Sequence, residues 1–273
     1  MNIAATAIVA MLAVARAQAS PPCAGEAPKW CASWKSPDEP FFNCSGSTAL
    51  APAQCEAWQE MYDVNGGANW TDCADARADP CGCHGKEHGK HGKGAIVYCK
   101  GDHIESIDMM GNKLTGTLTD ALSRMPELLM LNLGVNHLEG PLPAFPSTLV
   151  ELWLGGNKNP AGQHGLTGAI PDLSYMPKLH TLDLALNKLN GTIPLSLAKL
   201  KLLRVFYLYN NHLSGKVPAL DFAQYSYCGI GNGGPKGQHV GSNRNRWCTP
   251  LPLGAKGCNE EGGVCTGGSC HAC

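Results

Sequence analysis

Apolar residues in the middle of the chain recur in one frame with a spacing of about 24 residues. The frame is fullest where Leu179, Leu182 and Leu184 are followed by Asn187 and Leu189. Apolar residues that alternate with polar ones over so few positions predict a short strand with one buried side. Successive turns would pair these strands in a parallel sheet, so that each turn buries the apolar side of its neighbour.

Five turns match this frame closely, and a sixth is degenerate. The five occupy residues 104–118, 128–143, 149–171, 179–194 and 203–218, with an insertion inside the third. The degenerate turn contains Tyr225, Cys228, Ile230, Asn245, Trp247, Leu251 and Pro252, across a long Gly-rich insertion. Terminal repeats of such arrays are commonly atypical, so we expect this turn to close the array.

The residues that follow each strand predict how the chain turns. Each strand is followed by an Asn, which can both donate and accept hydrogen bonds, so a buried ladder of Asn would satisfy backbone groups there. Gly then permits a tight turn and Pro fixes an extended segment, which predicts a convex side of short irregular pieces. A helical bundle is disfavoured, because helices need apolar residues three and four apart without Gly and Pro in every turn.

The pattern Leu-x-Gly-x-Ile-Pro after Asn-x-Leu resembles the plant-type leucine-rich repeats of receptor-kinase ectodomains and polygalacturonase-inhibitor proteins. The resemblance covers roughly residues 53–258, and segments 62–70, 79–81 and 97–99 resemble the N-terminal cap of that family. It implies an α/β fold: a leucine-rich-repeat right-handed solenoid with a parallel concave sheet and disulfide-rich caps at both ends. It also implies sensing of a microbial or self ligand, or inhibition of a wall-degrading enzyme.

Charge and cysteine content indicate which partners and which compartment are expected. The chain has 21 Lys and Arg against 22 Asp and Glu, so no long-range field favours nucleic acid or anionic lipid. Eight of the 14 cysteines lie between Cys23 and Cys99 and six between Cys228 and Cys273, with none in the 128 residues between them. Even counts at both ends predict disulfide-stapled caps in an oxidising compartment, with the connectivity left open.

The N-terminal residues are typical of a secretory signal peptide. An apolar run from Ile3 to Val14 precedes the small-x-small segment 17–19, although no Lys or Arg lies near the start; an alanine-rich tail is the alternative. The run is shorter than the ~20 residues that span a bilayer, and no later segment qualifies. We therefore expect an extracellular protein, secreted or held at the cell wall or cell surface, with no membrane insertion and no kinase domain.

These observations divide the chain into four parts. They are a signal peptide (1–19), a Cys-rich N-terminal region and cap (20–103), the leucine-rich repeats (104–220), and a degenerate last repeat with a Cys-rich C-terminal cap (221–273).

Strand residues between the buried ones would face the concave side in columns that run from turn to turn. The central column would be Asp108, Asn132, Trp153, Asp183, Tyr207 and Gly229. The leading column before it would be Ser106, Met130, Glu151, Thr181, Val205 and Tyr227, and the trailing column after it Met110, Gly134, Gly155, Ala185, Tyr209 and Gly231. Large aromatics among acidic residues are typical of binding hot spots, unless the rings merely cover the sheet or pack on a cap loop.

The predicted ligand-binding residues are Asp108, Met130, Asn132, Glu151, Trp153, Asp183, Tyr207 and Tyr209. Glu151 and Asp183 would lie roughly 8 Å apart, inside the range of glycosidase carboxylates, but a shallow wet face should leave both carboxyls hydrated. No nucleophile elbow, P-loop or His-Glu-x-x-His motif is present, so we predict no catalytic residue, no enzyme and no cofactor.

Two Cys- and His-rich segments invite a metal-binding interpretation. His84, His88 and His91 lie in a Gly- and Lys-rich insertion, which we expect to be a mobile cap loop. Cys265, Cys270, His271 and Cys273 end the chain, where disulfides are favoured over a zinc or redox site. We therefore predict no metal site.

Glycosylation sequons begin at Asn43, Asn69 and Asn190, and the last two are the better acceptors, because Cys44 is a poor middle residue.

Three function classes remain. The favoured one is a recognition module, receptor-like or inhibitory, that binds a protein, peptide or glycan on the concave face, and not nucleic acid. The alternatives are a structural wall or matrix protein and, less favoured, a glycan-active enzyme. Fold similarity alone does not choose among them, because such repeats support many unrelated roles.

Overall fold

The computed structural model describes residue 44 and residues 49–85, 94–158, 162–231, 245–248 and 264–265. The predicted signal peptide lies outside these residues, as do Leu251 and Pro252 of the degenerate turn. Among the described residues the α-helix is α2 (Pro52–Val64), which begins with a Pro in its first turn, where a missing N–H does no harm. No helix in these segments is long and apolar enough to cross a bilayer.

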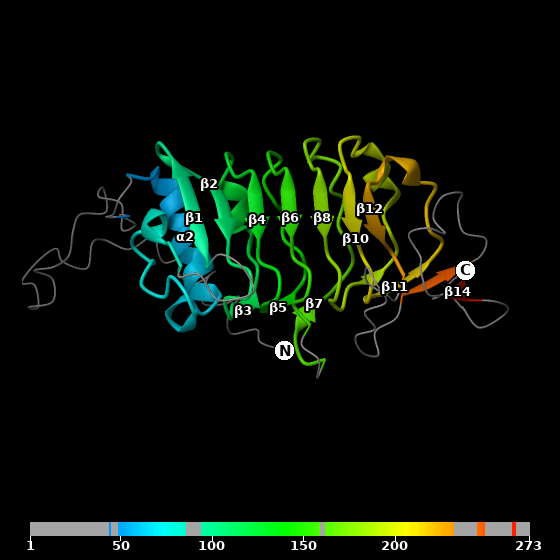
Figure 1. The fold of residues 1–273 in the computed structure, drawn as a ribbon, viewed down its shortest axis with the longest axis horizontal. Helices are drawn as coiled ribbons and strands as arrows, with labels where there is room; N and C mark the ends of the chain where they lie inside the picture. The colour runs from blue at the N-terminus through cyan, green and yellow to red at the C-terminus, as the bar shows by residue number, and fades with distance from the viewer. Residues whose placement is uncertain are drawn as a thin grey trace, which may run out of the picture. The chain divides into compact units, whose positions relative to one another are not determined.

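The repeat frame supplies six strands of a seven-stranded sheet, and β1 pairs at its N-terminal edge (Figure 1). Its strands, in spatial order, are β1 (Ile96–Lys100), β2 (His103–Asp108), β4 (Met130–Asn132), β6 (Glu151–Trp153), β8 (Thr181–Asp183), β10 (Val205–Tyr207) and β12 (Tyr227–Gly229). β1 is antiparallel to β2, and every other neighbouring pair is parallel. The parallel sheet that the spacing predicts is therefore confirmed.

The opposite side of the solenoid consists of short pieces, as the Gly and Pro pattern predicts. They are β3 (Thr115–Thr117), β5 (His137–Gly140) and β7 (Gly165–Leu166) in one small sheet, and β9 (Asn190–Gly191), β11 (His212–Gly215), β13 (Arg246–Cys248) and β14 (Val264–Cys265) in another. Between them lie the 3-10 helices η5 (Asp120–Arg124), η6 (Leu195–Lys199) and η7 (Phe222–Gln224). The frame Gly turns the chain at left-handed backbone angles, for example at Gly191 with φ 77°.

The core is a stack of apolar side chains with an Asn ladder beside it. Leu182 and its equivalents in neighbouring turns are fully buried. Asn187 Nδ2 donates to Leu154 O at 2.9 Å and to Leu184 O at 3.1 Å, while its Oδ1 accepts from Leu166 N at 3.0 Å. Asn136, Asn157, Asn211 and Asn245 make equivalent bonds. The predicted ladder is confirmed, and it satisfies buried groups that would each cost about 1–3 kcal/mol unpaired.

An aromatic cluster covers the first turn from the N-terminal side. Trp70 makes edge contacts with Trp58 and Tyr62 at centroid distances of 5.9 and 5.0 Å. Both indole N–H groups are satisfied by backbone oxygens, Trp58 at Ala76 and Trp70 at Asn65. This cluster gives the otherwise open end of the apolar stack a buried partner.

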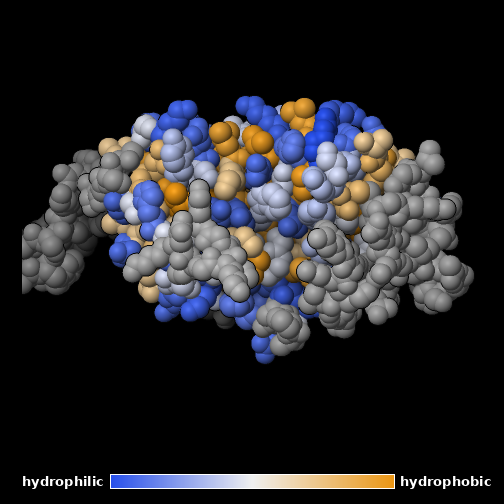
Figure 2. Space-filling view, viewed as in Figure 1, coloured by the Kyte–Doolittle hydropathy of each residue, from blue (hydrophilic) through white to orange (hydrophobic). Residues whose placement is uncertain are grey.

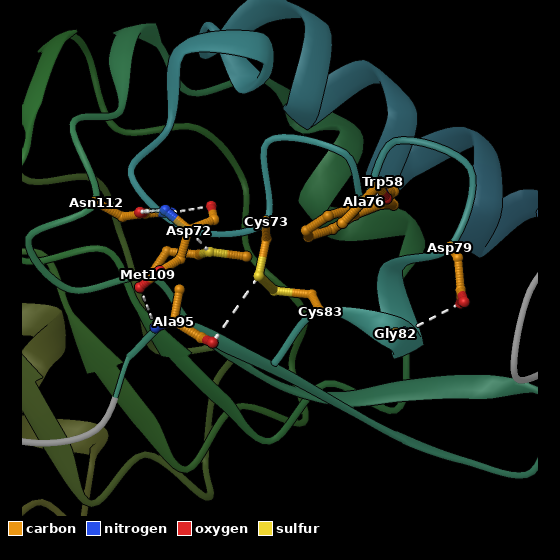
Figure 3. The surroundings of a disulfide bond; sticks show 10 residues. All are labelled: Trp58, Asp72, Cys73, Ala76, Asp79, Gly82, Cys83, Ala95, Met109 and Asn112. Atoms are coloured by element: carbon orange, nitrogen blue, oxygen red, sulfur yellow. Dashed lines mark hydrogen bonds between the residues drawn. A yellow bond between two sulfur atoms is a disulfide. The ribbon is translucent and has the colours of Figure 1, made fainter. Parts of the chain in front are cut away.

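Among the described residues of the N-terminal cap, three disulfides fix the chain. They join Cys44 to Cys55, Cys73 to Cys83 and Cys81 to Cys99, with Cα separations of 5.1–5.7 Å. Figure 3 shows the second of these beside Asp72, whose Oδ2 accepts the Ala95 N–H at 3.1 Å. At the other end of the repeats, Cys228 is also disulfide-bonded. The prediction of stapled caps is confirmed for these cysteines.

Candidate ligand-binding face

The strand register aligns the columns that the repeat frame predicts. From β2 to β12 the central column reads Asp108, Asn132, Trp153, Asp183, Tyr207 and Gly229, and the leading column reads Ser106, Met130, Glu151, Thr181, Val205 and Tyr227. Backbone hydrogen bonds extend the pairing to the trailing column, as from Gly156 N to Ala185 O and from Leu186 N to Tyr209 O, both 2.9 Å. The positions are therefore confirmed, whereas ligand binding by these residues remains a prediction.

β1 adds two residues to this face that were predicted to belong to the cap. Ile96 lies opposite Asp108, and Tyr98 lies opposite Ser106 with 54% of its surface exposed. Val97 between them is buried. This alternation is the signal that marks a strand, but β1 lies outside the repeat frame and runs antiparallel to it.

Aromatic rings gather at the C-terminal half of the concave face. Tyr207 and Tyr209 make an edge-to-face contact with ring centroids 5.8 Å apart. Gly229 in the next strand leaves room for them, because a Cβ there would lie 3.0 Å from Tyr209 Cδ1 and 3.4 Å from Tyr207 Cδ1. Loss of hydration raises the pKa of Tyr209 to about 12. These rings therefore shield their surroundings from water.

Asp183 lies in register between two of the aromatic residues, with Trp153 on β6 on one side and Tyr207 on β10 on the other. Its Oδ1 accepts the Ala185 N–H at 2.9 Å. Its carboxyl group occupies space that Gly155 leaves open, since a Cβ on Gly155 would lie 2.6 Å from Asp183 Oδ2.

Loss of hydration raises the pKa of Asp183 from an ordinary 3.8 to about 6, although the Ala185 hydrogen bond opposes the shift. The expectation that an open face would leave both carboxyls hydrated is therefore wrong for Asp183. Neighbouring rings and the missing side chain at Gly155 let the carboxyl settle into the surface. Among the described residues, no Lys, Arg or His forms an ion pair with it.

Glu151 has a different role from Asp183. Its Oε2 accepts the Trp153 Nε1–H at 2.9 Å, so the carboxylate holds the indole from two residues away on the same strand. In the register Glu151 lies opposite Thr181 and diagonal to Asp183, as the sequence analysis expects. The two carboxyls thus lie on adjacent strands, and one of them already has a donor.

The N-terminal half of the face has fewer aromatic residues. Asp108 Oδ1 accepts the Met110 N–H at 3.2 Å, and Asn132 Oδ1 accepts the Gly134 N–H at 3.2 Å. Met130 Sδ lies 3.4 Å from the Ser106 hydroxyl. Asp108 and Asn132 repeat the hydrogen bond of Asp183, but neither lies in register between two aromatic residues.

The other predicted sites are only partly within the described residues. His84 is exposed, while His88, His91, Cys270, His271 and Cys273 lie outside them. Within the described segments no three His, Cys, Asp or Glu residues are arranged to hold a metal ion. The predicted acceptors Asn69 and Asn190 are both exposed, in η2 (Gly67–Asn69) and β9, so each is accessible to a glycan. Glycan occupancy itself stays a prediction.

Comparison with known proteins agrees with this geometry. The Leucine Rich Repeat family model matches residues 178–200, the turn in which the frame is fullest. Receptor-like protein 53 of Arabidopsis thaliana is 38% identical over 115 residues, which are 41% of this chain and 11% of that protein. Receptor-like protein 35 of the same plant is 32% identical over 134 residues, 46% of this chain and 14% of that protein.

Among solved structures, a chain of the BIR3–SERK2 complex from Arabidopsis thaliana is 29% identical, with a TM-score of 0.44, over 55% of this chain and 80% of that chain. This chain spans less than a fifth of the length of either receptor-like protein. With the registered sheet and the Asn ladder, the repeat matches show that the chain is an α/β leucine-rich-repeat solenoid with a disulfide-bonded cap, and that its repeats are similar to those of plant receptor-like proteins.

Proposed function

We propose that this protein is an extracellular recognition module that binds a peptide or a protein segment on its concave face. The observation that carries the proposal is the central column, where Trp153, Asp183 and Tyr207 lie side by side on three adjacent strands. A desolvated carboxyl without a cationic partner is unfavourable for a protein that only needs a hydrated surface. Such a group among aromatic rings is typical of a binding site.

The surface composition and the compartment are both consistent with this role. Figure 2 shows hydrophobic and hydrophilic residues interspersed on the described surface that it views, without one continuous apolar patch. Mixed composition is typical of interfaces that form and dissociate. The repeat matches to receptor-like proteins and the disulfide-bonded cap support an extracellular or cell-surface location.

A random peptide library displayed on phage and panned against the full chain tests the proposal. We expect the wild type to enrich peptides, and the double variant Trp153→Ala with Tyr207→Ala to lose them without a change in melting temperature. The matched control is Leu195→Ala with Leu202→Ala, which removes two exposed apolar residues on and beside η6. If no peptide is enriched, or if both double variants retain the same peptides, the concave face is not the recognition surface.

A glycan-cleaving enzyme is the second candidate, because Asp183 has a raised pKa near 6 and Glu151 lies diagonal to it. It ranks second because Glu151 already binds the Trp153 indole. The test is the release of reducing ends from a panel of cell-wall and algal polysaccharides. Release by the wild type that is lost in Asp183→Asn and in Glu151→Gln would favour the enzyme over the recognition module. No release by the wild type would exclude the enzyme.

A further inference from the structure

The concave face has a charge balance that differs from that of the whole chain. The chain carries 21 basic against 22 acidic residues. The three columns, with six positions each from β2 to β12, contain Asp108, Glu151 and Asp183 but no Lys, Arg or His. Basic residues are thus absent from the columns although they are as frequent as acidic ones elsewhere. A face of this kind attracts cations and repels anions.

Asp183 is the desolvated acid of the three columns, and aromatic residues surround it. We name the group the C-terminal subsite; it consists of Trp153, Asp183, Tyr207 and Tyr209. Neighbouring strands lie about 4.8 Å apart, so residues in register with Asp183 border its side chain directly. Of the two carboxyl oxygens, Oδ1 accepts one backbone N–H, whereas a carboxylate offers about four acceptor positions. The subsite therefore has unused capacity for hydrogen-bond donors.

The aromatic residues of this subsite are held in place by neighbours that leave the carboxyl available. The Trp153 indole N–H donates to Glu151, and Tyr209 rests against Tyr207. Indole and phenol rings attract cations through their faces, most strongly for Trp. Glu151 adds a second negative charge next to the subsite. An acid bordered by aromatic rings, with no basic residue of its own face nearby, suits a guanidinium or ammonium group.

We propose that the C-terminal subsite binds the side chain of an Arg or Lys residue of a peptide ligand, with Asp183 as the counter-ion and Trp153 and Tyr207 as its walls. This inference rests on the proposed function, because it specifies which residue of the peptide this face recognises. A neutral sugar would stack on the rings but would leave the carboxyl without a cation. An anionic ligand is opposed by all three acidic residues of the columns.

The test begins with the peptides that the wild-type chain enriches. Each is synthesised with its Arg or Lys and again with neutral citrulline in that place, and both are measured by calorimetry on the wild type, on Asp183→Asn and on Asp221→Asn. Asp221 is the matched control, since it accepts the N–H of Ala223 two residues ahead in the same way but is exposed and lies outside the three columns. We expect citrulline to weaken wild-type binding at least about ten-fold.

Asp183→Asn should erase the difference between the two peptides, whereas Asp221→Asn should preserve it. Equal binding of both peptides by the wild type, or a difference that persists in Asp183→Asn, would overturn the inference. If the wild type enriches peptides without any Arg or Lys, the cation subsite fails while the recognition function stands. If it enriches none, both fail. The citrulline comparison on the wild type needs no variant to fold.

Discussion

Each half of the concave face has an aspartate at the same backbone position of the repeat, but the two aspartates have different neighbours. Asp108 and Asp183 occupy one column, and each accepts the N–H two residues ahead. Asp108 lies between Ile96 and Asn132, whereas Asp183 lies between two aromatic residues above a glycine. The repeat thus fixes where a side chain lies, and the neighbouring turns decide whether its charge is hydrated.

The largest expected effect is a difference in ligand affinity between variants of the two halves of the concave face. Replacing Trp153 and Tyr207 together by Ala should weaken binding of an enriched peptide about 1,000-fold, because two hot-spot anchors of ~2 kcal/mol each sum to about 4 kcal/mol and each ~1.4 kcal/mol is a factor of ten. Replacing Tyr98 and Met110, which are exposed at the N-terminal half, should change affinity by less than about three-fold. Calorimetric titration measures both, and equal losses would mean that the halves do not differ.

The second effect is on stability, and here the substitution is expected to improve the measured property and not to weaken it. The pKa of Asp183 is raised in the folded state, so its charge costs free energy wherever the group is ionised in both states. The cost is absent below the ordinary pKa of 3.8 and fully present above about 6. Asp183→Asn should therefore raise the free energy of unfolding at pH 7 by up to about 3 kcal/mol. Asp108→Asn should change it by less than about 0.5 kcal/mol.

Denaturant unfolding at several pH values measures this difference. The advantage of Asp183→Asn should shrink as the pH falls from about 6 toward about 4, since the wild-type carboxyl then becomes protonated when folded. A variant that is less stable than the wild type at neutral pH would show that the Asp183 carboxylate stabilises the fold, contrary to its desolvated surroundings.

The pH should also change ligand affinity. With a pKa of about 6, the ionised fraction of Asp183 rises from about one tenth at pH 5 to about nine tenths at pH 7. The groups that neighbour it are Glu151 on β6, Tyr207 on β10 and Tyr209 beyond it, and both tyrosines have raised pKa values, so they stay neutral over this range. Affinity for an Arg peptide should rise about ten-fold between pH 5 and pH 7, and the rise should vanish in Asp183→Asn.

The smallest effect concerns Glu151. In Glu151→Gln the amide oxygen can still accept the Trp153 N–H, so the indole should keep its place while one negative charge is lost. We expect about a three-fold loss of affinity and a weaker dependence on salt, as for a charge at the rim of a site. A loss as large as that of Asp183→Asn would make Glu151 the main counter-ion instead.

Much of this face could be predicted from sequence because its determinants are local. Alternation with period two sets which residues of a strand face outward, and the fixed frame sets which residues of successive strands are neighbours. The Asn ladder followed from the same frame. β1 was not predicted, because Ile96 and Tyr98 lie in a strand that the repeat does not include and that pairs antiparallel.

The desolvation of Asp183 could not be predicted from the repeat frame, for a different reason. Its desolvation depends on Gly155 one turn before it and on rings one turn after it, which in turn use space at Gly229. Packing across four successive turns is a tertiary property that no single repeat contains. The disulfide pairs were likewise open, because connectivity depends on distances between Cα atoms and not on spacing in the chain.

The central claim is that the Asp183 carboxyl is desolvated in the free protein and binds a cationic group of the ligand. Its side-chain carboxyl carbon can be followed by NMR through a pH titration, with Asp183→Asn to assign the signal. We predict a pKa near 6 in the free protein and a lower pKa when an Arg or Lys peptide is bound. An ordinary pKa of about 4 in the free protein, or no change on binding, would contradict the account.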